Sequence, residues 1–377
     1  MNKKIFISAG EPSGDLHASN LIKELKKLEP NFEFSGIGCD NMEALGVRML
    51  HRMDKLSIIG LWEVFSHITI IRNIFGKIKK EIGEKKIDLA ILIDYPGFNL
   101  YLAKMLYKRR IPCIYYITPQ LWAWGKWRIN NLRRYVKKAL VILKFEEDFY
   151  KKENIDAAFV GHPLLDEDYK LMPVKEAKAL LNLNPEKFTI ALVPGSRHLE
   201  VKRMLPVMIG AVKLLKNYNE IQFLVSQSPN VDEKIYRDIC KDFDAVIVKS
   251  DIYKCLNAAD FVFTSSGTVT LQIAIAEKPM LIIYIMSSLT ALFGKLLVKI
   301  PDIGLVNIIA KKRIVPEAVQ GDARPEVLAE KIEDIIYHKE KISAIKEDLR
   351  EVKNALGLRG ASERAAKIIY QFARTQQ

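Results

Sequence analysis

Short apolar runs alternate with longer amphipathic segments along the whole chain, and this alternation constrains the fold more than any other feature. Runs such as Lys4–Ser8 have the length of buried strands, whereas Asp15–Leu28 has the period of a helix. Strands separated by helices are typical of parallel sheets with helices on both faces. The sequence therefore predicts an α/β protein, with strands at Lys4–Ser8, Phe32–Ile37, Leu89–Ile93, Cys113–Ile117, Ala139–Leu143, Ala158–Val160, Phe188–Val193, Gln222–Val225, Ala245–Val248, Asp260–Phe263 and Met280–Ile285.

A polar interval divides this series of strands into two halves. Asp166–Lys170 and Pro173 precede a short helical segment that Asn184–Pro185 closes, as is typical of a linker. A chain of 377 residues is long enough for two domains. We expect two doubly wound, Rossmann-like domains, 1–168 and 169–345, facing a central cleft at the carboxyl ends of their strands. Helices in 346–377 are expected to pack back on the first domain. This arrangement resembles the GT-B architecture of glycosyltransferases.

The chain carries an excess of positive charge. Its 58 lysine and arginine residues exceed the 45 aspartate and glutamate residues by 13, which favours nucleic acid, phosphorylated ligands or anionic lipid as partners. Four scattered cysteines without a CxxC pair indicate a reducing compartment and argue against a structural metal. The apolar start, Ile5–Ala9, is too short for a signal peptide, and Met280–Gly294 falls short of the ~18 residues of a membrane span. We expect a cytoplasmic protein that does not cross a membrane.

Two turns that follow strands of the first half carry acidic residues. Gly10–Asp15, with the sequence GEPSGD, leads from a strand into a helix, where glycines and free amides let a ligand approach the backbone. Asp94–Asn99 follows the strand Leu89–Ile93, and Asp94 at the carboxyl end of that strand has the position of a general base. Asp15 and Asp94 each have a second interpretation, as a cap of the helix that follows.

Two turns of the second half have the residues of a phosphate site. Gly195, Ser196 and Arg197 follow one strand, and the arginine fork suits phosphate oxygens. Ser266–Thr268 follows another strand and combines hydroxyls, a glycine and a helix N-terminus. Helix capping is the commoner use of serine and threonine in each turn alone, but two such turns in one half favour a nucleoside diphosphate.

The segment Leu56–Lys80 predicts a helix with an unusually wide apolar arc followed by lysines. Such a helix is typical of the lipid interface, and the alternatives are a core helix or a homodimer contact. The expected membrane contacts are Trp62, Phe65, Ile68, Ile71 and Phe75. Trp122–Arg128 interleaves aromatic and basic residues, a pattern that suits nucleic acid, acyl chains with sugar phosphates, or a solvated basic helix.

Metal binding has one candidate, Asp166-Glu167-Asp168, which matches the DxD pattern of another glycosyltransferase architecture. It lies in the expected linker, and the six histidines lack ligand spacing. We therefore expect neither a metal nor a cofactor.

Taken in order, the motifs resemble those of the bacterial lipid-A-disaccharide synthase family over almost the whole chain. They are GExSGD at Gly10–Asp15, IDxPxFN at Ile93–Asn99, PxxWAW at Pro119–Trp124, GHP at Gly161–Pro163, PGSRxxEV at Pro194–Val201, SGT at Ser266–Thr268, Asn307 with Val315–Glu317 and Gln320, and a closing GAS.RAA at Gly360–Ala366. The resemblance implies an inverting, metal-independent hexosyltransferase of lipid A biosynthesis. Its donor would be UDP-2,3-diacylglucosamine, its acceptor 2,3-diacylglucosamine 1-phosphate (lipid X), and its products a β-1,6-linked tetraacyl disaccharide 1-phosphate and UDP. It also implies peripheral association with the inner membrane and no role for nucleic acid.

The resemblance assigns roles to individual residues. Asp94 is the expected base on the acceptor 6-hydroxyl, with Glu11 as the other acidic candidate. Gln272 departs from the glutamate usual in the family, and its amide can still hydrogen-bond ribose hydroxyls. The expected substrate- or UDP-binding residues are Ser13, Gly14, Asp15, Asn99, Gly195, Ser196, Arg197, Ser266, Gly267, Thr268, Gln272, Asn307 and Gln320.

Two other classes of protein share parts of this pattern. One is a different GT-B enzyme acting on a UDP-amino sugar, either a peptidoglycan glycosyltransferase or a UDP-GlcNAc 2-epimerase. A wide apolar helix has no use in an epimerase of a soluble sugar. The other is a non-enzymatic, basic RNA- or membrane-binding protein, which would show no turnover and salt-dependent RNA binding.

Overall fold

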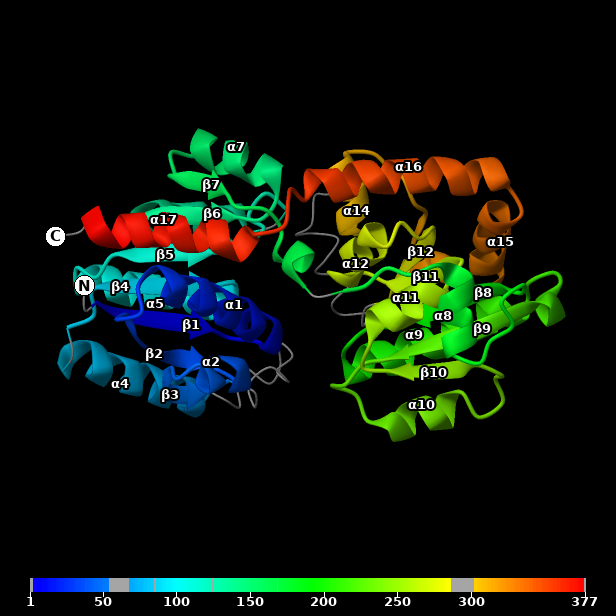
Figure 1. Cartoon of the computed structure of the whole chain (residues 1–377), viewed down its shortest axis with the longest axis horizontal. Helices are drawn as coiled ribbons and strands as arrows, with labels where there is room; N and C mark the ends of the chain where they lie inside the picture. The colour runs from blue at the N-terminus through cyan, green and yellow to red at the C-terminus, as the bar shows by residue number, and fades with distance from the viewer. Residues whose placement is uncertain are drawn as a thin grey trace. The chain divides into compact units, whose positions relative to one another are not determined.

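A computed structural model describes residues 3–53, 68–84, 86–123, 125–167, 169–285 and 302–375, without the side chains of 68–71. The chain divides into two compact units (Figure 1). The first comprises residues 1–167 and 356–377, and the second comprises residues 168–355. Each unit is built around its own parallel sheet.

The first unit contains a seven-stranded parallel sheet in the order β3-β2-β1-β4-β5-β6-β7. Its strands are β1 (Lys4–Ala9), β2 (Glu33–Gly38), β3 (Arg48–Arg52), β4 (Leu89–Ile93), β5 (Cys113–Tyr116), β6 (Lys138–Val141) and β7 (Ala157–Phe159). Its helices are α1 (Pro12–Leu28), α2 (Asp40–Ala44), α4 (Ile68–Glu84), α5 (Pro96–Lys108), α6 (Ile129–Tyr135), α7 (Lys144–Lys152) and α17 (Ala361–Thr375).

Both faces of this sheet are buried, because side chains alternate across a strand and each face has its own layer of helices. Ile5 and Ile7 pack with α1 and α17, whereas Phe6 between them packs with the helices of the opposite face. This alternation explains why each strand is a continuous apolar run.

The C-terminal helix α17 belongs to the first unit and packs against α1 (Figure 1). Its N-terminus is held by Asp166, whose carboxylate accepts the backbone N–H groups of Gly360 at 2.6 Å, Ala361 at 3.2 Å and Ser362 at 2.9 Å. The chain therefore passes from the second unit into the first between Ala355 and Leu356, whereas the expected boundary at 345/346 falls inside α16 (Lys339–Ala355).

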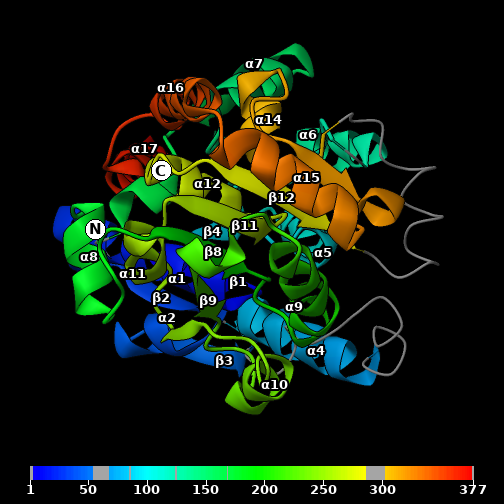
Figure 2. The same ribbon diagram turned by 90° about the vertical axis from the view of Figure 1, so that its right-hand side faces the viewer.

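The second unit repeats the design with a six-stranded parallel sheet in the order β10-β9-β8-β11-β12-β13. Its strands are β8 (Phe188–Val193), β9 (Ile221–Gln227), β10 (Val246–Lys249), β11 (Phe261–Ser265), β12 (Met280–Tyr284) and β13 (Glu317–Val319). Its helices are α8 (Val174–Leu180), α9 (His198–Lys213), α10 (Glu233–Ile239), α11 (Ile252–Ala258), α12 (Val269–Ile275), α14 (Leu305–Ala310), α15 (Pro325–Ile336) and α16. Figure 2 shows α9 and α15 on one side of the strands and α8 and α11 on the other.

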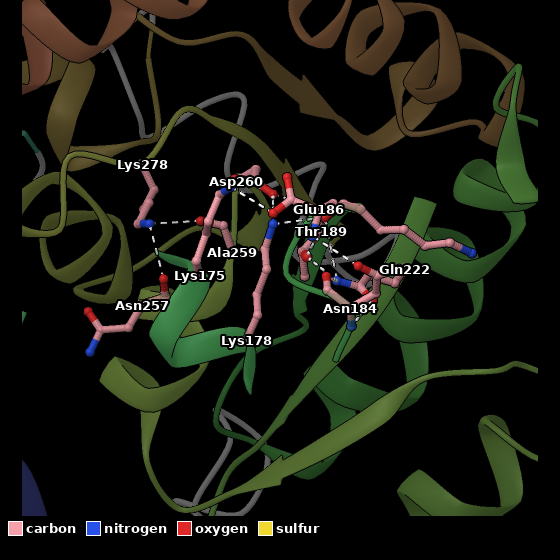
Figure 3. Close-up of polar contacts among 11 residues, drawn as sticks. Lys175, Lys178, Asn184, Glu186, Thr189, Gln222, Asn257, Ala259, Asp260 and Lys278 are labelled. Carbon is pink, nitrogen blue, oxygen red and sulfur yellow. Dashed lines mark hydrogen bonds and ion pairs between the residues drawn. The ribbon is translucent and has the colours of Figure 1, made fainter. Parts of the chain in front are cut away.

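A network of charged side chains around the buried Lys178 connects the amino ends of β8, β11 and β12 (Figure 3). The Lys178 ammonium, 3% exposed, donates to the Asp260 carboxylate at 2.6 Å, and the Thr189 backbone N–H donates to the same oxygen at 2.9 Å. Nearby, the Lys278 ammonium donates to the Ala259 carbonyl at 2.7 Å, and burial lowers the pKa of Lys278 to about 8. The network joins α8 to β8, β11 and β12, at the edge of the sheet opposite the carboxyl ends of the strands.

The prediction of two doubly wound parallel sheets is confirmed. Two edge strands, β3 and β13, were not expected from the sequence. Within the described ranges, no helix combines the length and hydropathy needed to cross a membrane. The part of the expected apolar helix before Ile68 lies outside the described residues, as do residues 286–294 of the apolar stretch Met280–Gly294.

Candidate active site

The four turns singled out in the sequence follow the strands at which each sheet reverses its order. In the first sheet β1 and β4 are neighbours, and Ala9 pairs in register with Ile93. In the second sheet β8 and β11 are neighbours, and Val193 pairs with Thr264. Doubly wound sheets bind ligands outside the carboxyl ends of the strands at such a reversal. Each sheet therefore presents two candidate turns at its ligand-binding edge.

Asp94 and Glu11 lie on adjacent turns of the first sheet. Asp94 directly follows β4, and Glu11 is the N-cap residue of α1, which follows β1. Both residues are partly buried. Burial and, to a lesser extent, the nearby Glu11 carboxylate together raise the pKa of the Asp94 carboxyl to about 6, against the opposing hydrogen bond from the Tyr95 amide. A carboxyl with a pKa near neutrality is suited to accept a proton from a hydroxyl.

The Asp94 side chain projects from a strained turn. Asp94 and Tyr95 have successive φ angles of 47° and 48°, in the left-handed region that residues with a side chain rarely adopt. The Tyr95 ring lies where a Cβ of residue 10 would be, so only glycine fits at Gly10. The two turns therefore depend on each other for their conformation.

Asn99 is fully buried beneath this turn, in the first part of α5. Its Nδ2 donates to the carbonyl oxygens of Ile93 at 3.0 Å and Asp94 at 2.7 Å, and its Oδ1 accepts the Ser8 hydroxyl at 2.6 Å. The Tyr115 hydroxyl also donates to the Asp94 carbonyl, at 2.7 Å. Asn99, expected as a substrate contact, thus uses its side chain within the protein.

Asp15 is also engaged within the protein. Its buried carboxylate accepts backbone N–H groups from Cys39 at 2.6 Å, Asn41 at 2.9 Å and Met42 at 3.4 Å, and so holds the start of α2. In the same turn Gly14 is buried against β1, whereas Ser13 is exposed. Of the expected contacts in this motif, Ser13 is the accessible side chain.

In the second unit, the turn at Gly195–Arg197 is organised by Glu200. Its carboxylate accepts the backbone N–H groups of Ser196 at 3.0 Å and Arg197 at 3.2 Å, and Gly195 has a φ of 117°. The Arg197 guanidinium lies 3.5 Å from Glu200, and its side chain is 69% exposed. The amides of Ser196 and Arg197 are therefore engaged by Glu200, while the cationic side chain of Arg197 reaches solvent.

The turn at Ser266–Thr268 is more open. Gly267 has a φ of 142°, and a Cβ there would meet no described atom within 4 Å. Gly267 and Thr268 are exposed, whereas the Ser266 hydroxyl donates to the Ile303 carbonyl at 2.9 Å. Gln272, which is partly buried, follows one turn later on α12.

Asn307, another expected contact, is fully buried. Its Nδ2 donates to Glu317 Oε1 at 2.7 Å and to the Val315 carbonyl at 2.9 Å, and its Oδ1 accepts the Ile314 amide at 2.9 Å. Glu317 in turn accepts the Gly304 amide at 2.9 Å. The pair holds the chain that leads into α14, while Gln320 is partly buried just after β13.

The residues of the metal candidate, Asp166-Glu167-Asp168, are not described as one group. Asp166 caps α17, and Asp168 lies outside the described residues. In the ranges that the structure describes, no three His, Cys, Asp or Glu side chains gather as a metal site requires.

The expected membrane helix is described from Ile68 onward, as α4. Ile74, Ile78 and Ile82 face the core of the first unit. Phe75, an expected membrane contact, is partly buried with its ring stacked 4.5 Å from that of Phe98. The side chains of Ile68 and Ile71, with all of Trp62 and Phe65, lie outside the described residues.

Sequence reasoning did not single out Ser8, Tyr115 or Glu200. Glu200 had a local signal, because a glutamate three residues after an N-cap position is a capping pattern. Ser8 and Tyr115 had none, since each lies within an apolar strand and acquires its partner only when the strands pair.

Two Rossmann-like units of this kind place the protein in the class with the GT-B architecture, which glycosyltransferases share with UDP-sugar epimerases. A UDP-GlcNAc 2-epimerase from Neisseria meningitidis, solved with UDP-GlcNAc, has the same fold, with a TM-score of 0.67 over 98% of this chain and 100% of that one. Its 13% identity shows a shared fold alone.

Sequence comparison identifies the family. The sequence model of the lipid-A-disaccharide synthetase family matches residues 5–372. Lipid-A-disaccharide synthases from Syntrophus aciditrophicus and Geobacter metallireducens are 40% and 39% identical, and the matches cover 97% and 98% of this chain and 97% of each relative. The chain belongs to the lipid-A-disaccharide synthetase family and is a glycosyltransferase. The epimerase, peptidoglycan-transferase and non-enzymatic alternatives are not favoured.

Proposed function

We propose that the protein transfers 2,3-diacylglucosamine from UDP-2,3-diacylglucosamine to the 6-hydroxyl of 2,3-diacylglucosamine 1-phosphate, forming a β-1,6 linkage and releasing UDP. The observation that carries this proposal is that four of the family motifs, two in each unit, follow the strands at which the sheets reverse their order. Such a placement divides the reaction between an acidic first unit and a phosphate-binding second unit.

In the first unit, Asp94 is the proposed general base. Inversion at the anomeric carbon requires removal of a proton from the attacking 6-hydroxyl. Asp94 has the appropriate pKa, and its turn is fixed by neighbouring groups. Glu11 is close enough to influence that pKa and is the second candidate for the role. Ser13 is the accessible hydroxyl nearby for a substrate contact.

In the second unit, Arg197 and the turn Ser266–Thr268 are the proposed site of the UDP diphosphate. The exposed guanidinium can form charge-assisted hydrogen bonds to phosphate oxygens. The open backbone at Gly267 allows a phosphate to approach the chain closely. Positive groups of this kind stabilise a leaving diphosphate without a metal, and Gln272, one helical turn after Thr268, is the proposed contact to a ribose hydroxyl.

We further infer peripheral association with the inner membrane, because both substrates carry acyl chains. Support comes from the net charge of +13 and from exposed aromatic groups on the first unit. Tyr101, 60% exposed, packs edge-on against Phe75, and Trp127, 65% exposed, has the Arg128 guanidinium 5.6 Å from its ring centre. Aromatic and cationic side chains together suit an anionic lipid surface.

A direct assay tests the reaction. Purified protein is incubated in detergent with UDP-2,3-diacylglucosamine and lipid X, and UDP release is followed together with mass spectrometry of the lipid product. We expect stoichiometric UDP and tetraacyl disaccharide 1-phosphate. UDP-GlcNAc epimerisation without transfer, or no turnover at all, would contradict the proposal.

A further inference from the structure

The turn that carries Asp94 is not a conformation that its own residues favour. Two successive residues with side chains, Asp94 and Tyr95, adopt left-handed φ angles of 47° and 48°. Such residues keep this conformation only when the surrounding structure enforces it, and they concentrate where a functional group must be aimed. The contacts around the turn identify what enforces it.

Asn99 makes the central contacts. Its two amide protons are donated to the consecutive carbonyl oxygens of Ile93 and Asp94, at 3.0 and 2.7 Å, so one side chain holds the peptide groups on both sides of Asp94. The Ser8 hydroxyl, donating to Oδ1 at 2.6 Å, fixes which end of the amide faces the turn. Tyr115 adds a second donor to the Asp94 carbonyl at 2.7 Å.

These contacts come from three different elements. Ser8 lies on β1, Tyr115 on β5 and Asn99 on α5, and all three surround the end of β4. Each of the three residues is fully buried. Asn99 therefore has no free surface for a substrate, and any effect on the reaction must pass through the turn.

We propose that Asn99 is the positioning residue for Asp94, holding the strained turn so that the carboxylate points out of the sheet edge toward the acceptor hydroxyl. The inference rests on the proposed function, in which Asp94 is the base. Ser8 and Tyr115 assist, the first by orienting the Asn99 amide and the second by sharing the Asp94 carbonyl.

The test compares Asn99→Ala and Ser8→Ala with the parent in the UDP-release assay. Asn99→Ala is expected to lower kcat by about 10²-fold, the scale on which a misplacement of about 1 Å acts. KM for the donor and affinity for UDP should change little, because the proposed diphosphate site lies in the other unit. Ser8→Ala leaves the two Asn99 donors in place, so it should lower kcat by less than Asn99→Ala does. This milder variant still tests the proposal if Asn99→Ala does not fold.

The pH profile separates positioning from general stability. Relaxation of the turn would expose Asp94 to water, so the acid limb of kcat/KM should move from about pH 6 toward the ordinary carboxyl value of 3.8. Asn257→Ala is the matched control, because Asn257 is also a buried asparagine that donates to a backbone carbonyl, that of Lys170 at 2.8 Å. Asn257→Ala should reduce stability, but it should leave unchanged both the kcat of the folded protein and the acid limb of kcat/KM.

A double substitution distinguishes the positioning role of Asn99 from the proposed role of Asp94 as the base. In an Asp94→Asn background, Asn99→Ala should cause no further loss of kcat, since there is no base left to position. A full additional loss there, or parental kcat and pH profile in folded Asn99→Ala and Ser8→Ala, would overturn the positioning role alone. Parental activity of Asp94→Asn itself would instead overturn the proposed base.

Discussion

At the scale of single residues, Asp94 gives the sharpest prediction. Its carboxyl must be deprotonated to accept a proton, and its pKa is raised to about 6. The kcat/KM profile should therefore fall below about pH 6. Asp94→Asn should lower turnover by roughly 10²–10⁴-fold at pH 7.5, the usual contribution of a positioned general base. UDP binding, measured by calorimetry, should be retained.

The stability of the same variant gives an independent check. Because the folded-state pKa of Asp94 lies above the ordinary 3.8, folding favours the protonated carboxyl, and stability is lost as pH rises from about 4 through 6. Asp94→Asn removes this loss. Its melting temperature should exceed the parental value at pH 7 by more than it does at pH 4, and near-parental turnover would transfer the role of base to Glu11.

Arg197 carries the second residue-scale prediction. Its side chain is 69% exposed, and its one acidic neighbour in the described structure, Glu200, lies 3.5 Å away. Arg197→Ala should weaken UDP binding by about 1.5–3 kcal/mol, the usual contribution of a charge-assisted hydrogen bond. Titration calorimetry with UDP measures this directly, and unchanged affinity would exclude Arg197 from the diphosphate site.

The sequence located the candidate turns better than it assigned the side chains within them. Asp15 and Asn99 belong to motifs at the ligand-binding edge and Asn307 to a later motif, yet each directs its polar atoms to groups within the protein. A sequence shows that a polar residue is placed beside a ligand-binding turn. Whether the residue faces the ligand or holds the turn depends on strands that lie far apart in the chain.

At the scale of elements, the strands that the sequence missed share a physical reason. β3 has the sequence RMLHR at the edge of its sheet and is only partly buried, while β13 has three residues at the edge of the other. Central strands are continuous apolar runs because both faces are covered. Both missed strands lack such a run, since β3 begins and ends with arginine and β13 has only three residues, of which the first is a glutamate.

The cap of α17 provides an element-scale prediction. Asp166 accepts three backbone N–H groups at the start of this helix, so Asp166→Ala should lower the free energy of unfolding by about 0.5–2 kcal/mol. Glu363→Ala is the matched control, since Glu363 forms an exposed pair with Lys367 and should contribute little. Urea titrations of both variants measure the difference.

Activity in EDTA tests the rival role of the same aspartate. If Asp166 only caps the helix, chelation should leave turnover unchanged, since Arg197 and the Ser266–Thr268 turn supply the positive groups at the diphosphate. Loss of activity restored by magnesium or manganese would revive the metal interpretation of Asp166-Glu167-Asp168.

At the scale of the whole molecule, the doubly wound order of both sheets followed from the alternation of strands and helices, because that alternation allows few other topologies. The apolar helix is a different case. Between Ile68 and Glu84 the wide apolar arc of the helix is explained by packing within the first unit. Ile74, Ile78 and Ile82 fill the core, and Phe75 stacks on Phe98. The membrane proposal therefore depends chiefly on the residues that precede this stretch and on the surface around Tyr101 and Trp127.

The last prediction tests how the whole molecule meets a lipid surface. Replacement of Phe65, Ile68 and Ile71 by serine should lower binding to anionic phospholipid vesicles, because each inserted apolar side chain contributes about 1.5–3 kcal/mol. The protein should remain folded. Ile78→Ser is the control, since Ile78 is fully buried in the first unit and its replacement should sharply lower the melting temperature. Vesicle flotation and melting curves on both variants separate the cases: a triple variant that unfolds like Ile78→Ser would place its side chains in the core. A folded triple variant with normal flotation and a smaller mass by light scattering would instead assign them to a homodimer contact.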